Sequence, residues 1–133
     1  MIASVEWKQD DIYDGRSQSG HTIRFDATAE HAAGPSPMEA VLTALCACTS
    51  VDVVSILRKK REPLEGLVVT ADAEQAPAPP RTFTRIHLTY KIRGPVAQKA
   101  AEDAVSLSKN KYCSVSKMLE KAAEIDYSIE YES

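Results

Sequence analysis

The sequence predicts an α+β fold, because runs of alternating apolar and polar residues stand on both sides of one long, nearly continuous apolar run. The alternating runs have the two-residue period of half-buried strands, whereas the apolar run is too long for a strand. Three strands are expected before this run, and two strands, two helices and a last strand after it. No internal repeat or low-complexity tract interrupts this order, so residues 1–133 are expected to form a single domain.

Short strands and a loop are expected before the apolar run. Residues 5–8 and 11–14 are the first two predicted strands, and residues 15–20 contain the glycines and serines of a turn. Residues 21–26 alternate polar and apolar side chains, as a half-buried strand does. Small residues over 30–36 then indicate a loop.

A long helix is predicted from Pro37 to about Lys59. Ser36 is its expected N-cap, Pro37 suits the first helical position, and Glu39 completes a capping box three residues after Ser36. Basic residues 58–61 interact favourably with the helix dipole at the C-terminal end, and a proline follows them. Because its middle is apolar on nearly every face, the helix is expected to be buried all round.

The rest of the chain predicts two strands, two helices and a closing strand. The strands are expected at 67–73 and 83–92, joined by a short proline-rich connector, and the second alternates most cleanly. Amphipathic helices are expected over 96–109 and 114–123, and the closing strand over 125–131.

Composition and charge exclude several classes of function. The net charge is −3, the pI is about 5.6 and no run of lysine or arginine is long, so no nucleic acid or membrane partner is expected. The N-terminus has no secretory signal pattern, and Thr49, Ser50 and Asp52 interrupt the apolar run, so no transmembrane helix is expected. The protein is therefore expected in the cytoplasm.

No metal is expected either, because the histidines are scattered and Cys-x-Cys is not the usual spacing of zinc ligands.

Three cysteines carry the main chemical signal, and in a reducing compartment they are expected to be free thiols. Cys48 lies within the apolar helix, and Cys113 opens a later helix, where backbone N–H groups favour a thiolate. One thiol oxidised to a sulfenic acid can be resolved by a second thiol to a disulfide. Alternatively, Cys48 is a small packed side chain and Cys113 a helix cap. Cys46 lies about 200° around the helix from Cys48 and is expected to be a packed residue.

Two carboxylates lie near these thiols in the sequence. Asp52 is four residues after Cys48 and on its face of the helix, where an unpaired charge would raise the pKa of the thiol. Asp52 is therefore expected either to form a salt bridge or to hold a cation that activates Cys48. Glu39 shares a face with Cys46 rather than with Cys48, so it is expected to cap the helix or to orient a cation across a dimer.

Two segments resemble motifs of the OsmC/Ohr family of thiol-dependent organic hydroperoxide reductases. The family typically has an Asn-Pro-Glu-like helix start, a cysteine further along that helix, and a Cys-Pro-x-Ser-like second motif. Here Ser36-Pro37-Met38-Glu39 precedes Cys48, and Cys113-Ser114-Val115-Ser116 occupies the second place. The element order matches over nearly the whole chain, and residues 19–21 and 83–87 look like an OsmC-like subgroup.

The resemblance implies a homodimer of two intertwined subunits, with antiparallel sheets wrapped around long central helices and two active sites at the interface. It implies Cys48 as the peroxidatic thiolate, Cys113 as the resolving thiol, and Glu39, one position after the family's key glutamate, as a third catalytic residue. The family's arginine is not carried over to Arg16, because the surrounding segment does not align.

The function implied is reduction of organic or fatty-acid hydroperoxides in oxidative-stress defence. The resemblance further implies a dithiol reductant, lipoyl-linked in better-known relatives, in place of a bound cofactor. A hydrophobic pocket formed by the central helices would favour bulky peroxides. The alternative expectation is a non-catalytic dimer of the same fold that binds a small apolar or acidic ligand.

Overall fold

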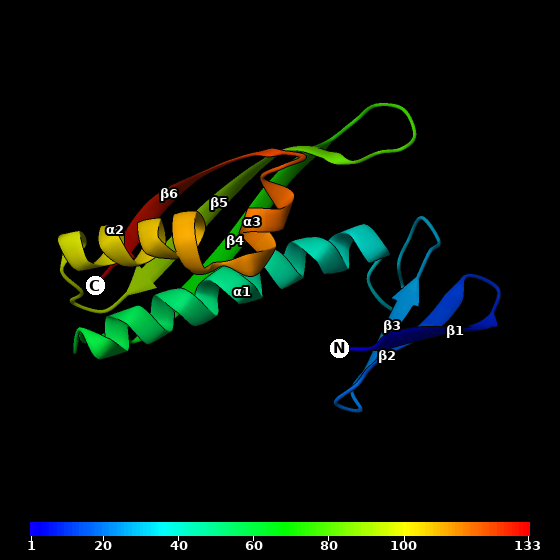
Figure 1. Ribbon diagram of the computed structural model, residues 1–133, viewed down its shortest axis with the longest axis horizontal. Helices are drawn as coiled ribbons and strands as arrows, with labels where there is room; N and C mark the ends of the chain where they lie inside the picture. Colours follow the sequence, from blue (N-terminus) through cyan, green and yellow to red (C-terminus); the bar gives the residue numbers. More distant parts are fainter. The chain divides into compact units, whose positions relative to one another are not determined.

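The computed structural model describes all 133 residues and confirms the predicted α+β class (Figure 1). The chain forms two compact units, Met1–Leu42 and Thr43–Ser133, which are described separately. The expectation of one domain over the whole chain stays a prediction.

The first unit contains a three-stranded antiparallel sheet in the order β1-β2-β3. Its strands are Ala3–Gln9, Ile12–Ser17 and Thr22–Asp26. The turn predicted over 15–20 is wrong in its first half, because β2 continues through Gly15 to Ser17. Gly15 is needed for packing, since a Cβ atom there would lie 2.9 Å from the ring of Phe25.

Helix α1 spans Pro37–Lys59, as predicted (Figure 1). Its buried side chains form one stripe at four-residue spacing, namely Leu45, Thr49, Val53 and Leu57. The expected burial on all faces is not found within this chain, because the elements packed on α1 cover only one side. Val51, for example, is 68% exposed.

By length and composition alone, α1 could cross a membrane, and the expectation that it does not stays a prediction. This is weak evidence, because the central helix of a globular domain passes the same test. The buried stripe of α1 also carries a threonine whose hydroxyl is bonded to other elements of the same unit.

The second unit contains a sheet in the order β4-β5-β6, with strands Gly66–Gln75, Phe83–Arg93 and Glu124–Glu132. Strands β4 and β5 are antiparallel, but β5 and β6 are parallel, so this sheet is mixed rather than antiparallel throughout. The helical segment between β5 and β6 makes the crossover that a parallel pair requires. Every second residue of β5 from Ile86 on is buried, as is Phe83, and these side chains form the centre of the core: Phe83, Ile86, Leu88, Tyr90 and Ile92.

The crossover consists of α2 (Gln98–Leu107), a π-helical turn η1 (Ser108–Tyr112) and α3 (Ser114–Leu119). Both helices are shorter than predicted. The π-helical turn begins where α2 was expected to continue, and α3 ends in a turn instead of reaching residue 123. In Figure 1, α2 runs beside the second half of α1, and the two helices lie over the sheet of the second unit.

Candidate functional site

The thiols of Cys48 and Cys113 lie together in the second unit, in hydrogen-bond contact with each other. Cys48 is half-buried in the middle of α1, and Cys113 is fully buried at the N-cap of α3. The Cys113 Sγ accepts a hydrogen bond from the backbone N–H of Ser116 at 3.4 Å. Both cysteines are free thiols.

The electrostatic environment of Cys113 favours the thiol over the thiolate. Burial raises the pKa of Cys113 to about 11; the Ser116 N–H opposes this rise, and Cys48 and Asp52 add to it. The Ser116 N–H favours a Cys113 thiolate, as expected at a helix start, but burial outweighs this hydrogen bond. Cys113 therefore keeps its proton at neutral pH.

Ser108, the first residue of η1, connects this segment to α1. Its carbonyl oxygen accepts a hydrogen bond from the backbone N–H of Cys113 at 2.7 Å. This bond joins residues five apart and closes the π-helical turn. Its hydroxyl donates to Asp52 Oδ2 at 2.8 Å and lies 2.7 Å from Thr49 Oγ1. One buried serine thus holds Cys113 through its backbone and Asp52 and Thr49 through its side chain.

The hydroxyl network continues to β5. Thr49 Oγ1 lies 2.7 Å from the hydroxyl of Tyr90, and both side chains are fully buried. An ionised Asp52 can only accept, so Ser108 donates to Asp52, Thr49 donates to Ser108, and Tyr90 donates to Thr49. Every buried side-chain oxygen and nitrogen has a partner. The Asp52 carboxylate therefore determines which group donates in each hydrogen bond of this network.

Neither expected basic partner of Asp52 is found within this chain, and a cation supplied by a second subunit stays a prediction. No lysine, arginine or histidine nitrogen lies within 4.0 Å of its carboxylate, so it forms no salt bridge and holds no cation beside Cys48. The Ser108 hydroxyl fills that place. Sequence reasoning missed Ser108 and Tyr90. The only available signal was Thr49, a polar residue in the buried stripe of an apolar helix.

Cys46 is a half-buried packed residue, as expected. Burial raises the pKa of its thiol, which is in hydrogen-bond contact with the backbone of Ala71 in β4. It is therefore turned toward a different neighbour from Cys48.

Glu39 is part of the predicted capping box. Its Oε1 accepts from the backbone N–H of Ser36 at 2.9 Å, and its own N–H donates to Ser36 Oγ at 3.1 Å. His31 Nε2 lies 3.9 Å from the same carboxylate oxygen. These contacts give Glu39 a structural role, and its catalytic role stays a prediction.

Two substitutions at Glu39 separate these roles. We expect Glu39→Ala to lower the free energy of unfolding by about 1 kcal/mol through loss of the cap, and Glu39→Gln to keep most of it, because an amide oxygen still accepts from Ser36. Urea unfolding measures this difference. If Glu39 only caps the helix, Glu39→Gln keeps any peroxide-reducing activity, and a large loss in that variant would assign the charge a catalytic role.

The buried titratable groups predict a loss of stability in alkali. The pKa of Tyr90 is raised to about 12, mainly by burial, and that of Cys113 to about 11. Unfolded, the two groups ionise near 10.0 and 9.0, so above about pH 9 the folded chain binds more protons than the unfolded chain. Their stabilising contribution is full below about pH 9 and is lost by about pH 12.

We expect the free energy of unfolding to fall across that range by roughly 2–3 kcal/mol from Cys113 alone. Urea unfolding at increasing pH measures the fall, and Cys113→Ser should flatten its lower part. An unchanged alkaline slope in Cys113→Ser would contradict the assignment of this part to Cys113.

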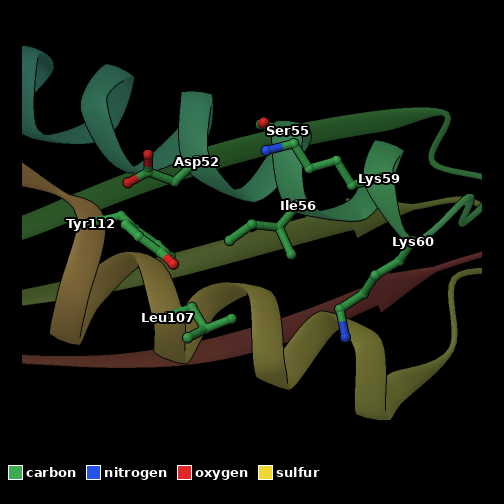
Figure 2. Close-up of a pocket in the computed structure, with 7 residues that line it drawn as sticks. All are labelled: Asp52, Ser55, Ile56, Lys59, Lys60, Leu107 and Tyr112. Atoms are coloured by element: carbon green, nitrogen blue, oxygen red, sulfur yellow. The ribbon is translucent and has the colours of Figure 1, made fainter.

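A cavity of about 500 Å³ lies between α1 and the α2–η1 segment (Figure 2). Ile56 and Leu107 face each other in its middle, with Asp52 and Tyr112 toward one end and Lys60 at the other. Ser55 and Lys59 complete the lining. The cavity has the volume of small-molecule sites, although its lining is more charged than the expected hydrophobic pocket.

Comparisons with known proteins show what the sequence and the fold of this chain are similar to. The profile of a family described as OsmC-like protein matches residues 29–128. The protein YhfA of Escherichia coli (strain K12) is 44% identical over 131 residues, which cover 98% of this chain and 97% of that protein.

Two solved structures extend the comparison to three dimensions. A hypothetical protein from Aquifex aeolicus VF5 has a TM-score of 0.85 and 28% identity, covering 99% of this chain and 97% of that one. The organic hydroperoxide resistance protein OsmC from Legionella pneumophila has a TM-score of 0.73 and 17% identity, covering 97% of this chain and 95% of that one. The second likeness concerns the fold alone.

Proposed function

Because this chain belongs to the OsmC-like protein family, we propose that it is a thiol peroxidase that reduces organic or fatty-acid hydroperoxides in oxidative-stress defence. The observation that carries the proposal is the contact between the Cys48 and Cys113 thiols, which come from elements far apart in the sequence. The similar protein from Legionella pneumophila is an organic hydroperoxide resistance protein, which supports the same class of substrate.

The reaction begins at Cys48, the half-buried member of the pair. Its thiolate attacks one oxygen of the peroxide, an S–O bond forms as the O–O bond breaks, and an alcohol leaves with a proton from the site. Cys48 is now a sulfenic acid. The Cys113 sulfur attacks the Cys48 sulfur, the S–S bond forms, and the hydroxyl group leaves as water with the Cys113 proton.

A dithiol reductant then restores the enzyme. Its first sulfur attacks the disulfide to give a mixed disulfide, and its second sulfur displaces the enzyme thiol, so the reductant leaves as a disulfide. The protein needs no bound cofactor for these steps. We propose a lipoyl-type dithiol as reductant, and a cytoplasmic location for the reaction.

The active form in this proposal is a homodimer. The exposed apolar face of α1, which includes Val51 at 68% exposure, would be covered by the second subunit. The second subunit would also supply the cation that this chain does not place beside Asp52. Without such a cation the carboxylate opposes formation of a thiolate nearby.

The alternative function is a non-catalytic dimer that binds a small ligand. The raised pKa of Cys113 favours it, because a thiol that keeps its proton is a poorer nucleophile. The charged cavity between α1 and the α2–η1 segment also favours it.

Steady-state turnover distinguishes the two functions. We expect the protein to consume cumene hydroperoxide at the expense of dihydrolipoamide, and to consume hydrogen peroxide more slowly. The Cys46→Ser variant is the matched control and should keep the rate. Absence of peroxide consumption with dihydrolipoamide and with other dithiols would contradict the peroxidase proposal and favour the binding function.

A further inference from the structure

We propose that Ser128, His87 and Asp126 form a second reactive site, in which Ser128 takes the acyl group of a small activated ester and releases it to water. The three side chains come from the neighbouring strands β5 and β6. None of them belongs to the cysteine pair or to its hydroxyl network, so the inference does not rest on the proposed function.

The three residues lie on the face of the β4-β5-β6 sheet that is turned away from the helices. Tyr90 of β5 is bonded to a side chain of α1, so it points toward the helices, which lie over that face in Figure 1. His87 is three residues before Tyr90, so its side chain points to the opposite face. Asp126 and Ser128 come one and three residues after the buried Ile125, and they share the face of His87.

The register of the two strands brings these side chains within reach of each other. Asp126 is directly opposite His87 in the parallel pair, and Ser128 is two residues, or about 6.6 Å, further along β6. His87 Nδ1 lies 2.8 Å from Asp126 Oδ1, and His87 Nε2 lies 3.0 Å from Ser128 Oγ. The imidazole therefore bridges a carboxylate and a hydroxyl through its two nitrogens, which is the arrangement that serine hydrolases use.

The carboxylate determines which nitrogen of the imidazole carries the proton. A hydrogen bond from His87 and the charge of Arg85, whose Nη2 lies 3.5 Å from Oδ2, hold the pKa of Asp126 below its usual range. Because an ionised Asp126 can only accept, Nδ1 of the neutral imidazole carries the proton and donates it. Nε2 then accepts the hydrogen of the Ser128 hydroxyl, so a general base is in contact with this serine.

The exposure of the site determines the class of substrate. The side chains of His87 and Asp126 are 40% and 49% exposed, and Ser128 is also exposed. An open sheet face excludes little water and encloses little of a substrate, so the reactivity must come mainly from the leaving group. We therefore expect a small ester with a good leaving group, such as an aryl acetate, rather than a peptide or an alkyl ester.

The reaction transfers the acyl group first to Ser128 and then to water. The Ser128 oxygen attacks the ester carbonyl while His87 Nε2 takes the hydroxyl proton, and the C–O bond to the leaving group breaks as His87 returns that proton to it. Thr89, the register partner of Ser128, shares this face, and its hydroxyl can donate to the carbonyl oxygen as that oxygen becomes negative. Water then attacks acyl-Ser128, His87 passes a proton from the water to the serine oxygen, and a carboxylic acid leaves.

Labelling with a fluorophosphonate, which forms a stable adduct with activated serines, tests Ser128 directly. We expect peptide mass spectrometry to find the adduct on Ser128, and its rate of formation to fall on the order of a hundredfold in His87→Ala. Asp126→Asn should slow labelling about tenfold, whereas Asp126→Glu, which keeps a charged acceptor, should retain more of the rate. Ser106 is the internal control, since this serine is bonded to Asn110 at 3.3 Å rather than to a histidine.

Hydrolysis of p-nitrophenyl acetate measures turnover, which we expect to exceed one equivalent in the original protein and to be lost in Ser128→Ala. Absence of an adduct on Ser128, or labelling that is as fast in His87→Ala, would overturn the inference. Hydrolysis that is lost in Cys48→Ser but kept in Ser128→Ala would also overturn it, because a thiol would then be the nucleophile. The peroxidase proposal is tested separately, since Ser128→Ala keeps both cysteines.

Discussion

Replacing Cys48 by serine should reduce peroxide turnover on the order of a thousandfold or more, because the hydroxyl cannot replace the attacking sulfur. Replacing Cys113 by serine should instead leave one turnover, after which Cys48 remains a sulfenic acid because no second thiol resolves it. Peroxide consumption measures the first effect. Mass spectrometry after trapping with dimedone measures the second, as one adduct on Cys48.

The two variants together test the assignment of roles. Cys46→Ser is the control, because Cys46 contacts the backbone of β4 rather than the cysteine pair. If Cys48→Ser keeps its turnover while Cys113→Ser loses it, the roles of the two thiols are reversed. If the dimedone adduct appears on Cys46, the contact between Cys48 and Cys113 has no part in the reaction.

Replacing Ser108 by alanine should lower the free energy of unfolding by about 2–4 kcal/mol. The substitution removes the donor to Asp52 and the acceptor for Thr49 in a buried network, and no other side chain takes either place. Urea unfolding of both proteins measures the loss. Ser106→Ala is a matched control on α2, because Ser106 bonds only to the exposed Asn110 at 3.3 Å.

A double substitution shows whether the network is the cause. In the combined Ser108→Ala and Asp52→Ala variant, the carboxylate that would lack a donor is itself removed, so the second change should cost little beyond the first. A loss in Ser108→Ala as small as that in Ser106→Ala would contradict the central place of Ser108. Simple addition of the two single losses would also contradict it.

Local signals explain why much of the fold was predictable. The family and the α+β class are confirmed. Ser36, Pro37 and Glu39 determine the start of α1 within one turn of helix, and the predicted bounds of this helix are those observed. From Ile86 on, the apolar residues that alternate along β5 are likewise the buried ones.

The errors arise where a distant partner decides the local structure. Gly15 resembles a turn residue, but the ring of Phe25 from the next strand requires glycine within β2. The end of α2 is set by the bond from the Cys113 N–H to the Ser108 carbonyl and by the attachment of Ser108 to α1. Periodicity within one segment contains no information about such contacts.

The same division holds for the candidate site. The contact between Cys48 and Cys113 was implied by family resemblance alone, since no helix or strand spacing joins the two residues. Asp52 was identified from its place one turn after Cys48, but its partner was predicted to be a cation and is the Ser108 hydroxyl. The roles of Cys48, Cys113 and Glu39 in catalysis stay predictions.

The central claim is that Cys48 and Cys113 act as one redox pair, and counting thiols tests it most directly. Free thiols are titrated in the reduced protein before and after one equivalent of cumene hydroperoxide, and the oxidised product is mapped by mass spectrometry. The account predicts the loss of two of the three thiols and a peptide linked through Cys48 and Cys113. Survival of all three thiols in excess peroxide, or a disulfide that includes Cys46, would contradict it.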